Sequence, residues 1–285
     1  MIPSTSSHVN IDGDVIVYAV GFASEQKRHR TSDGKLFEEQ ADADRYVDRY
    51  DLEPWEIVKV PDDLGKTLHS VRVMVDTIVE AAKATTYTVY LTGPTNFRDD
   101  VARFQPYKGH RADSAKPTHY EAIRAYLMEE CNGSETIGQE ADDALSILAC
   151  EKGHTIATID KDLDNTAGWH YNWKRDDLYY VNEREADLNF HLQLLTGDAT
   201  DNIPGLFKAT GKKAMAKTKN RVIARPTPRE MYEEVIAIYE EACEEKEVDL
   251  NVKAFIKEIG QLLWMRREAG QMYGEHIYAE DTTAG

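Results

Sequence analysis

Residues 155–162 read Thr-Ile-Ala-Thr-Ile-Asp-Lys-Asp, a short apolar strand followed at once by two carboxylates. A similar arrangement occurs near the start of the chain, where the short strand at residues 9–11 (Val-Asn-Ile) precedes Asp12. Residues 86–91 (TYTVYL) form a third apolar run, rich in the β-branched and aromatic side chains typical of buried strands. Residues 178–181 favour a further strand.

Helical patterns lie between and after these strands. The segments with helical spacing or composition are residues 68–84, 120–128, 144–149, 230–242 and 252–265. Gly153 is a helix stop for the third of them. Strands that alternate with helices predict an α/β fold with a mostly parallel sheet. The acids that follow strands would then lie at the carboxyl edge of the sheet, where open α/β sheets bind ligands.

The composition allows a buried core and argues against a membrane protein. The chain has 285 residues, of which 41% are hydrophobic and 30% charged. No apolar run approaches the ~20 residues of a membrane span, and the N-terminus lacks the apolar segment of a secretory signal. The three cysteines show no metal-ligand spacing, which favours a reducing cytoplasm over disulfides. Residues 33–66 are acidic and polar, and we interpret them as an elaborated connection without obvious chemistry.

The charge distribution is more informative than the net charge of −17, which by itself argues against a nucleic-acid partner. Residues 202–229 contain no acid. Their basic residues are Lys208, Lys212, Lys213, Lys217, Lys219, Arg221, Arg225 and Arg229. A cationic island in an acidic chain predicts a localised contact with phosphates, and the alternative is a solvated loop.

Acidic residues gather in four short clusters. They are Asp12 with Asp14, Glu140 with Asp142 and Asp143, Asp160 with Asp162, and Asp198 with Asp201. Crowded carboxylates repel and are tolerated in a folded interior only when cations neutralise them. Hard oxygen ligands at this density suit Mg²⁺ or Mn²⁺ rather than zinc. The pattern therefore predicts metal-assisted phosphoryl chemistry.

Each cluster taken alone also has a plain structural interpretation. Asp142 and Asp143 diverge by about 100° if they begin a helix, so they could address different ions or simply complement the helix dipole. Asp160 and Asp162 share a face of an extended segment and could converge on one ion, or form a solvated turn. The last pair, spaced i and i+3, fits one helical face, a tight turn or an N-cap.

Residues 107–111 (Tyr-Lys-Gly-His-Arg) add positive charge in a predicted loop. Lys108 could neutralise charge on a scissile phosphate and Arg111 could clamp it, and the plain alternative is a surface loop. In order, this motif and those at 140–143, 160–163 and 197–205 resemble the signature of the 5′-nucleases, the flap-endonuclease and 5′→3′ exonuclease family. The motifs span about the first three quarters of the chain, and the chain looks most like the short bacteriophage 5′→3′ exonucleases.

The resemblance implies an architecture and a set of site residues. It implies a PIN-like, Rossmann-like core in residues 1–197, and a helix–hairpin–helix-like duplex-binding element followed by C-terminal helices in residues 198–285. Two Mg²⁺ or Mn²⁺ ions are implied, and Lys108 and Arg111 would contact the scissile phosphate. The first ion would be held or supported by Asp12, Glu140, Asp142 and Asp143, and the second by Asp160, Asp162, Asp198 and Asp201. DNA contacts are expected from Tyr107, Lys116, Gly205, Lys208, Gly211, Lys212, Lys213 and Lys217.

The implied activity is hydrolysis of phosphodiesters from 5′ ends of duplex or flap DNA and of RNA–DNA hybrids. Since no base edge need be read, we expect selectivity for structure rather than sequence. The resemblance suggests primer removal during phage DNA replication, beside other replication proteins. We expect a monomer in the cytoplasm, which would be the host's if a phage encodes the chain.

Three departures from the family pattern qualify these expectations. The stretch Leu91-Thr92-Gly93-Pro94 lacks the usual acid after the second strand, so Thr92 or a water substitutes, or the first ion binds more weakly. The hairpin keeps only its end glycines, Gly205 and Gly211, which weakens the case for the family's backbone-coordinated K⁺. About 28 residues separate Arg111 from Glu140, which leaves room for a short arch at most.

Two other functions compete with this interpretation. Asp12-Gly13-Asp14 resembles the nucleophile motif of haloacid-dehalogenase-type phosphatases, with Asp12 as a covalent nucleophile. That reading leaves residues 107–111, residues 140–143 and the cationic island unexplained. The second is a non-catalytic DNA-binding protein of the same fold, which the missing acid near Gly93 supports.

Overall fold

The computed structural model describes residues 3–109 and 114–274, and its centre is a six-stranded sheet in the order β6-β5-β1-β7-β8-β9. The strands are β1 (His8–Asp12), β5 (Thr86–Leu91), β6 (Gly133–Glu135), β7 (Thr155–Ala157), β8 (Gly168–Asn172) and β9 (Asp177–Val181). All neighbouring strands are parallel except β8 and β9, which are antiparallel. The predicted α/β fold with a mostly parallel sheet is confirmed.

Helices cover both faces of this sheet. The helices α1 (Gly13–Ala23), α3 (Leu64–Ala81) and α5 (Tyr120–Glu130) pack on one another, and α6 (Ala141–Lys152) packs against β1, β5 and β7. Alternation along β5 explains the two faces. Val89 and Leu91 join the core formed with α1, α3 and α5, whereas Tyr90 packs beside Leu145 of α6. As predicted, Gly153 ends α6, in a left-handed conformation with φ of 66°.

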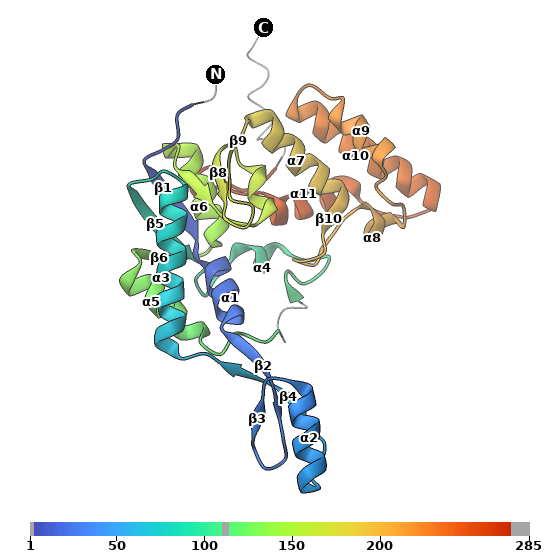
Figure 1. Cartoon of the computed structure of the whole chain (residues 1–285). Coiled ribbons are helices and arrows are strands. Elements are labelled where there is room, and N and C mark those ends of the chain that lie inside the picture. Colours follow the sequence, from blue (N-terminus) through green and yellow to red (C-terminus); the bar gives the residue numbers. More distant parts are fainter. Residues whose placement is uncertain (1–2, 110–113, 275–285) are drawn as a thin grey trace.

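A small subdomain projects from this body (Figure 1). It consists of β2 (Glu25–Arg30), β3 (Leu36–Phe37) and β4 (Glu56–Pro61) in an antiparallel sheet, with α2 (Gln40–Tyr50) packed against it. The sequence interpretation of residues 33–66 as a connection missed β3, α2 and β4, and no strand was predicted at β2. Residues 25–30 (EQKRHR) are all polar, so they lack the apolar alternation by which strands are recognised.

A second hydrophobic core lies under the C-terminal helices. It joins α7 (Glu183–Thr196), α8 (Leu206–Thr210), α9 (Ala216–Ile223), α10 (Pro228–Lys246) and α11 (Val252–Leu263). Phe190 and Leu194 of α7 are fully buried in it with Tyr239 of α10 and Ile256 of α11. The domain division at residue 197 stays a prediction, and the packing places α7 with the helices that follow it.

Short elements connect the two cores. They are α4 (Phe97–Val101), the 3-10 helix η2 (Lys161–Asn165), and the two-stranded β10 (Gly197–Asp198) and β11 (Ile203–Pro204). None of the helices in residues 3–109 and 114–274 combines the length and the apolar character needed to cross a bilayer.

Candidate functional site

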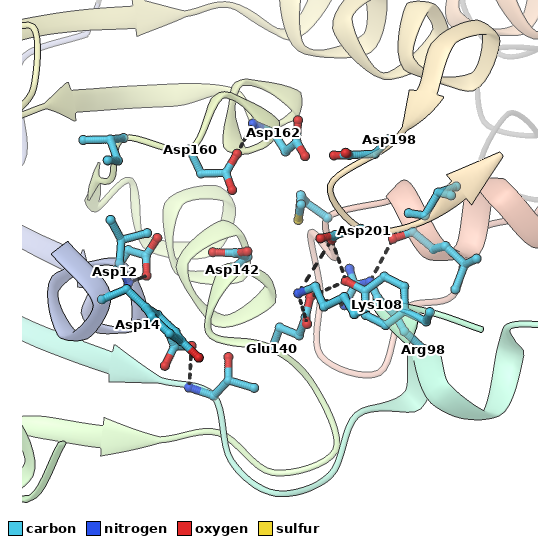
Figure 2. Close-up of a pocket in the computed structure, with 18 of the residues that line it drawn as sticks. Asp12, Asp14, Arg98, Lys108, Glu140, Asp142, Asp160, Asp162, Asp198 and Asp201 are labelled. Carbon is cyan, nitrogen blue, oxygen red and sulfur yellow. Dashed lines mark hydrogen bonds and ion pairs between the residues drawn. The ribbon is translucent and has the colours of Figure 1, made fainter. Parts of the chain in front are cut away.

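A pocket of about 760 Å³ opens at the carboxyl edge of the central sheet, and acids line it. These acids are Asp12, Asp14, Glu140, Asp142, Asp160, Asp162, Asp198 and Asp201. Figure 2 shows their side chains around one shared space, although they come from the end of β1, from α1, from the start of α6, from the segment after β7 and from the β10–β11 turn. All four acidic clusters of the sequence therefore contribute to one site.

Asp12 is the last residue of β1 and caps α1. Its carboxylate accepts hydrogen bonds from the Val15 N–H at 3.1 Å and from the Thr158 hydroxyl at 2.8 Å. Burial, followed by the charge of Asp14, raises the pKa of Asp12 to about 7. Thr158, which sequence reasoning missed, also accepts the N–H of Asp160 at 3.0 Å, so its hydroxyl joins the first and third clusters.

The third and fourth clusters meet across the pocket. Asp160 caps η2 and accepts the Asp162 N–H at 2.9 Å, and the carboxyl groups of Asp162 and Asp198 face the same pocket and interact. Burial and this contact raise the pKa of Asp162 to about 7. The pKa of Asp198 is lowered, because the interactions with Asp162 and with the Thr200 N–H outweigh the opposing effect of burial. Asp198 and Asp201 lie in a tight turn, which is one of the geometries expected for this pair.

Lys108 joins the second cluster to the fourth. Its Nζ lies 2.6 Å from Glu140 and 3.6 Å from Asp201. The Tyr107 hydroxyl donates to the same two carboxylates, at 2.9 Å each. The pKa of Glu140 is lowered because Lys108 and Arg98 outweigh the effect of burial. The pKa of Lys108 is raised because Glu140 and Asp201 outweigh its burial.

Asp142 and Asp143 diverge, as predicted for the start of a helix, but only Asp142 lines the pocket. Burial and the charges of Asp12 and Asp160 raise the pKa of Asp142 well above its ordinary value. Asp143 is fully buried, and its two oxygens accept from Arg98 at 2.5 and 3.0 Å. The Asp143 carboxylate is paired with Arg98 and does not line the pocket, so of the two expected roles, holding or supporting the first ion, this geometry favours support, and the role itself stays a prediction.

Arg98 is the main residue that sequence reasoning missed. Its side chain is fully buried, and it also donates to the carbonyl oxygens of Leu262 and Trp264 at 2.9 Å each. No sequence motif around Arg98 indicates its role, because the residues that it binds lie far away in the chain. It fixes the start of α6, and with it Glu140 and Asp142, against the C-terminal helices.

The Thr92 hydroxyl, which could substitute for the missing acid, is already engaged in a hydrogen bond. It accepts the Ala141 N–H at 2.9 Å, and the Thr92 N–H donates to Asp14 at 3.0 Å. Asp14 also accepts from Arg124 at 3.0 Å. Burial raises the pKa of Asp14, although its bonds to Thr92 and Arg124 oppose the shift. Asp14 therefore places a carboxylate beside the end of β5, where the strand itself supplies none.

The cationic island is partly neutralised by α10. Glu234 accepts from Arg221 and Arg225, Glu233 pairs with Arg229, and Glu245 pairs with Lys212. Four lysines of the island form no ion pair with any of the described residues. They are Lys208, Lys213, Lys217 and Lys219. Lys208, Lys213 and Lys217 are exposed, which favours them as phosphate contacts, and the DNA contacts of all the predicted lysines stay predictions.

The other predicted DNA contacts divide into two groups. Tyr107 is only 9% exposed and its hydroxyl is engaged inside the pocket, which it lines, and its DNA contact stays a prediction. Gly205 is buried, and a Cβ there would lie 2.3 Å from the Thr196 carbonyl carbon, so packing explains this glycine. Gly211 ends α8 with φ of 74°, and Lys116 lies 4.1 Å above the Tyr120 ring. Arg111 lies outside the described residues.

The donor chemistry of the pocket fits hard divalent cations. Among the described residues, its charged lining is carboxylates with the cations Arg98, Lys108 and Arg124, and no cysteine or histidine of that part of the chain lines it. Arg98 and Arg124 already bind Asp143 and Asp14, so negative charge is left in excess. Within residues 3–109 and 114–274, no three such side chains form a ready coordination sphere. The individual ligands therefore stay predictions, whereas the charge and oxygen chemistry suit Mg²⁺ or Mn²⁺.

No family model matches the chain, and no curated protein matches it. Among solved structures 14 chains match. A T5 5′-exonuclease is 13% identical, with 90% of this chain and 99% of its own covered and a TM-score of 0.44. The bacteriophage T5 flap endonuclease with DNA and metal ions is 14% identical, with coverages of 90% and 98% and a TM-score of 0.44.

The catalytic core of Rad2 in complex with a DNA substrate is 10% identical, with 90% of this chain and 73% of its own covered and a TM-score of 0.45. The resemblance expected from the motifs is thus also found among solved structures. At these identities and TM-scores it carries no weight for chemistry, which we base on the geometry of this chain.

Proposed function

We propose that this chain is a divalent-metal-dependent 5′-nuclease that hydrolyses phosphodiesters from the 5′ ends of duplex or flap DNA. One observation carries the proposal: carboxylates from four separate segments line one pocket beside Lys108. Such a pocket matches the need of phosphodiester hydrolysis for bound cations and for a protein cation near the phosphate.

The residues divide the work as follows. Asp12, Asp142, Asp160, Asp162, Asp198, Asp201 and Glu140 would hold two Mg²⁺ or Mn²⁺ ions, with Asp14 beside them. Bound ions of this kind activate water and stabilise charge on the phosphate and the leaving oxygen. Lys108 contributes a further positive charge at the phosphate, and Tyr107 orients Glu140 and Asp201 through its hydroxyl.

Aromatic side chains also line the pocket, which supports a nucleic-acid substrate. Tyr18 lies 5.5 Å from Tyr120 and 6.0 Å from Phe22 between ring centroids, and all three line the pocket. Aromatic faces accept unpaired bases of any sequence by stacking. The exposed lysines around α8 and α9 would contact duplex phosphates, which gives affinity without sequence readout. We extend the proposal to RNA–DNA hybrids and primer removal in phage replication.

The deciding experiment is a cleavage assay on one duplex labelled separately at its 5′ and 3′ ends, with Mg²⁺, Mn²⁺ or EDTA. Short products from the 5′ label that disappear with EDTA are the expected result. Products only from the 3′ label, or cleavage that survives EDTA, would contradict it. Binding without cleavage under both metals would favour the non-catalytic alternative, and hydrolysis of small phosphoesters instead of DNA would favour the phosphatase.

A further inference from the structure

Two tight turns, at residues 106–108 and 201–202, are joined by hydrogen bonds beside the point where the Lys108 side chain enters the pocket. The Lys108 N–H donates to the Asp201 carbonyl at 2.9 Å, and the Asn202 side-chain amide donates to the Pro106 carbonyl at 2.9 Å. These two bonds run in opposite directions between the segments 106–108 and 201–202. They join a loop of the N-terminal half to the first turn of the segment that leads into α8.

Both turns adopt an uncommon backbone conformation at the contact. Lys108 has φ of 50° and Asn202 has φ of 59°, both in the left-handed region. Asparagine tolerates this region better than other residues with a side chain, whereas lysine does not share that preference. The conformation of Lys108 must therefore be maintained by its surroundings, and the Asn202 amide is one of the groups that hold it.

We propose that Asn202 is a positioning residue for Lys108, so that the approach to the duplex-binding helices sets where the lysine ammonium lies. The inference rests on the proposed function, in which Lys108 faces the phosphate. Asn202 does not line the pocket and its amide bonds only a backbone carbonyl, so it touches no reacting group. It acts by fixing the turn from which the Lys108 side chain reaches Glu140, 2.6 Å away.

The proposal has a direct test in Asn202→Gly, which keeps the left-handed backbone available while removing the amide. Asn132→Gly is the matched control. Asn132 also has φ of 50°, and its amide donates to the Tyr87 carbonyl at 2.6 Å, but it does not line the pocket. Both variants lose the same kind of bond, so their difference reports position rather than stability.

Hydrogen exchange of the Lys108 backbone N–H is the first readout, and it does not require cleavage. We expect Asn202→Gly to speed this exchange at least about tenfold and Asn132→Gly to leave it unchanged. Unchanged exchange in Asn202→Gly would overturn the proposal. Because this readout needs no nuclease activity, it separates failure of the positioning role from failure of the proposed function.

Single-turnover cleavage with a double-mutant cycle is the second readout. We expect Asn202→Gly to slow cleavage at saturating DNA about 10- to 100-fold, with the Kd for DNA nearly unchanged. In a Lys108→Ala background the same change should alter the rate less than about twofold, since its effect passes through Lys108. Equal losses in both backgrounds, or a loss in DNA affinity alone, would overturn the positioning role.

Discussion

Arg98 binds the carboxylate of Asp143 with both terminal guanidinium nitrogens, at 2.5 and 3.0 Å, although the two residues are 45 positions apart in the chain. Arg98 belongs to α4, Asp143 to the first turn of α6, and the same guanidinium reaches two carbonyls at the end of α11. The pair therefore ties the acidic helix start to the second core.

Removing one partner of this pair should unfold the protein more easily. We expect Asp143→Ala to lower the free energy of unfolding by about 3–5 kcal/mol, because the buried guanidinium loses its two-bonded partner and keeps only the Glu140 carboxylate, 3.7 Å away. Urea unfolding measures this. The double variant Arg98→Met with Asp143→Leu should recover much of the loss, since no charge is left unpaired. A loss below about 1 kcal/mol for Asp143→Ala would contradict the buried pairing.

The adjacent residue should behave in the opposite way. Asp142→Asn removes a carboxyl group whose pKa is raised by burial and by Asp12 and Asp160, so we expect no loss of stability. The same variant should weaken Mn²⁺ binding, measured by calorimetry, because it removes an oxygen charge from the pocket. Unchanged Mn²⁺ affinity in Asp142→Asn would remove this residue from the ligand set.

Asp160→Ala should stop cleavage and leave DNA binding intact. We expect the rate to fall by more than about 100-fold, since residues that merely support metal ligands are worth about 10- to 100-fold. Asp164→Ala is the control within the same 3-10 helix, because Asp164 accepts from the Tyr179 hydroxyl at 2.6 Å and does not line the pocket. The measurements are a gel-based cleavage assay with Mg²⁺ and a gel-based DNA-binding assay in EDTA. Equal losses of cleavage in Asp160→Ala and Asp164→Ala would mean that the loss comes from disturbing the 3-10 helix and not from removing a metal ligand.

Charge reversal of the unpaired lysines should change the salt dependence of DNA binding. We expect Lys213→Glu with Lys217→Glu to reduce the slope of log K against log salt by about 2, at about 0.9 per phosphate contact. Lys83→Glu with Lys152→Glu makes the same charge change at residues that precede β5 and β7, at the sheet edge opposite the pocket. Fluorescence anisotropy at several salt concentrations is the measurement. Equal slopes for the two double variants would exclude α9 and its preceding loop from the interface.

His191 should make stability depend on pH. Burial lowers its pKa from 6.5 to about 4, and its Nδ1 lies 2.6 Å from the Asp187 carbonyl oxygen. The unfolded chain then binds the proton more strongly, so this contribution is complete above pH about 6.5 and is lost as pH falls toward about 4. The loss should reach about 3 kcal/mol at the acid end, at 1.36 kcal/mol per pKa unit.

Urea unfolding between pH 4.5 and 7 tests this expectation by comparing the wild type with His191→Gln. The variant should lack most of the decline that His191 causes. His69→Gln, at an exposed position on α3, serves as the matched control and should follow the wild type. A wild-type decline that persists in His191→Gln would assign the pH dependence to the carboxylates instead.

The strand-end acids could be predicted because their information is local. The β-branched and aromatic composition of residues 86–91, the stop at Gly153 and the acids after residues 9–11 and 155–159 can be recognised without any distant contact. Parallel strands bring their carboxyl ends to one edge, so a linear list of strand-end acids already implies one pocket. The projecting subdomain could not be predicted, because its first strand is polar throughout and is held by pairing with β3 and β4.

The sequence by itself determined the α/β class, the position of the acidic pocket and its carboxylate chemistry, because backbone periodicity and side-chain type are short-range properties. Only the tertiary structure decided which acids face that pocket. Asp142 and Asp143 are neighbours of the same type, yet one lines the cavity and the other is neutralised by Arg98. The tertiary structure likewise decided the hydrogen bond from the Asn202 side-chain amide to the Pro106 carbonyl oxygen. Such pairings depend on the packing of segments far apart in the chain, and no local pattern records them.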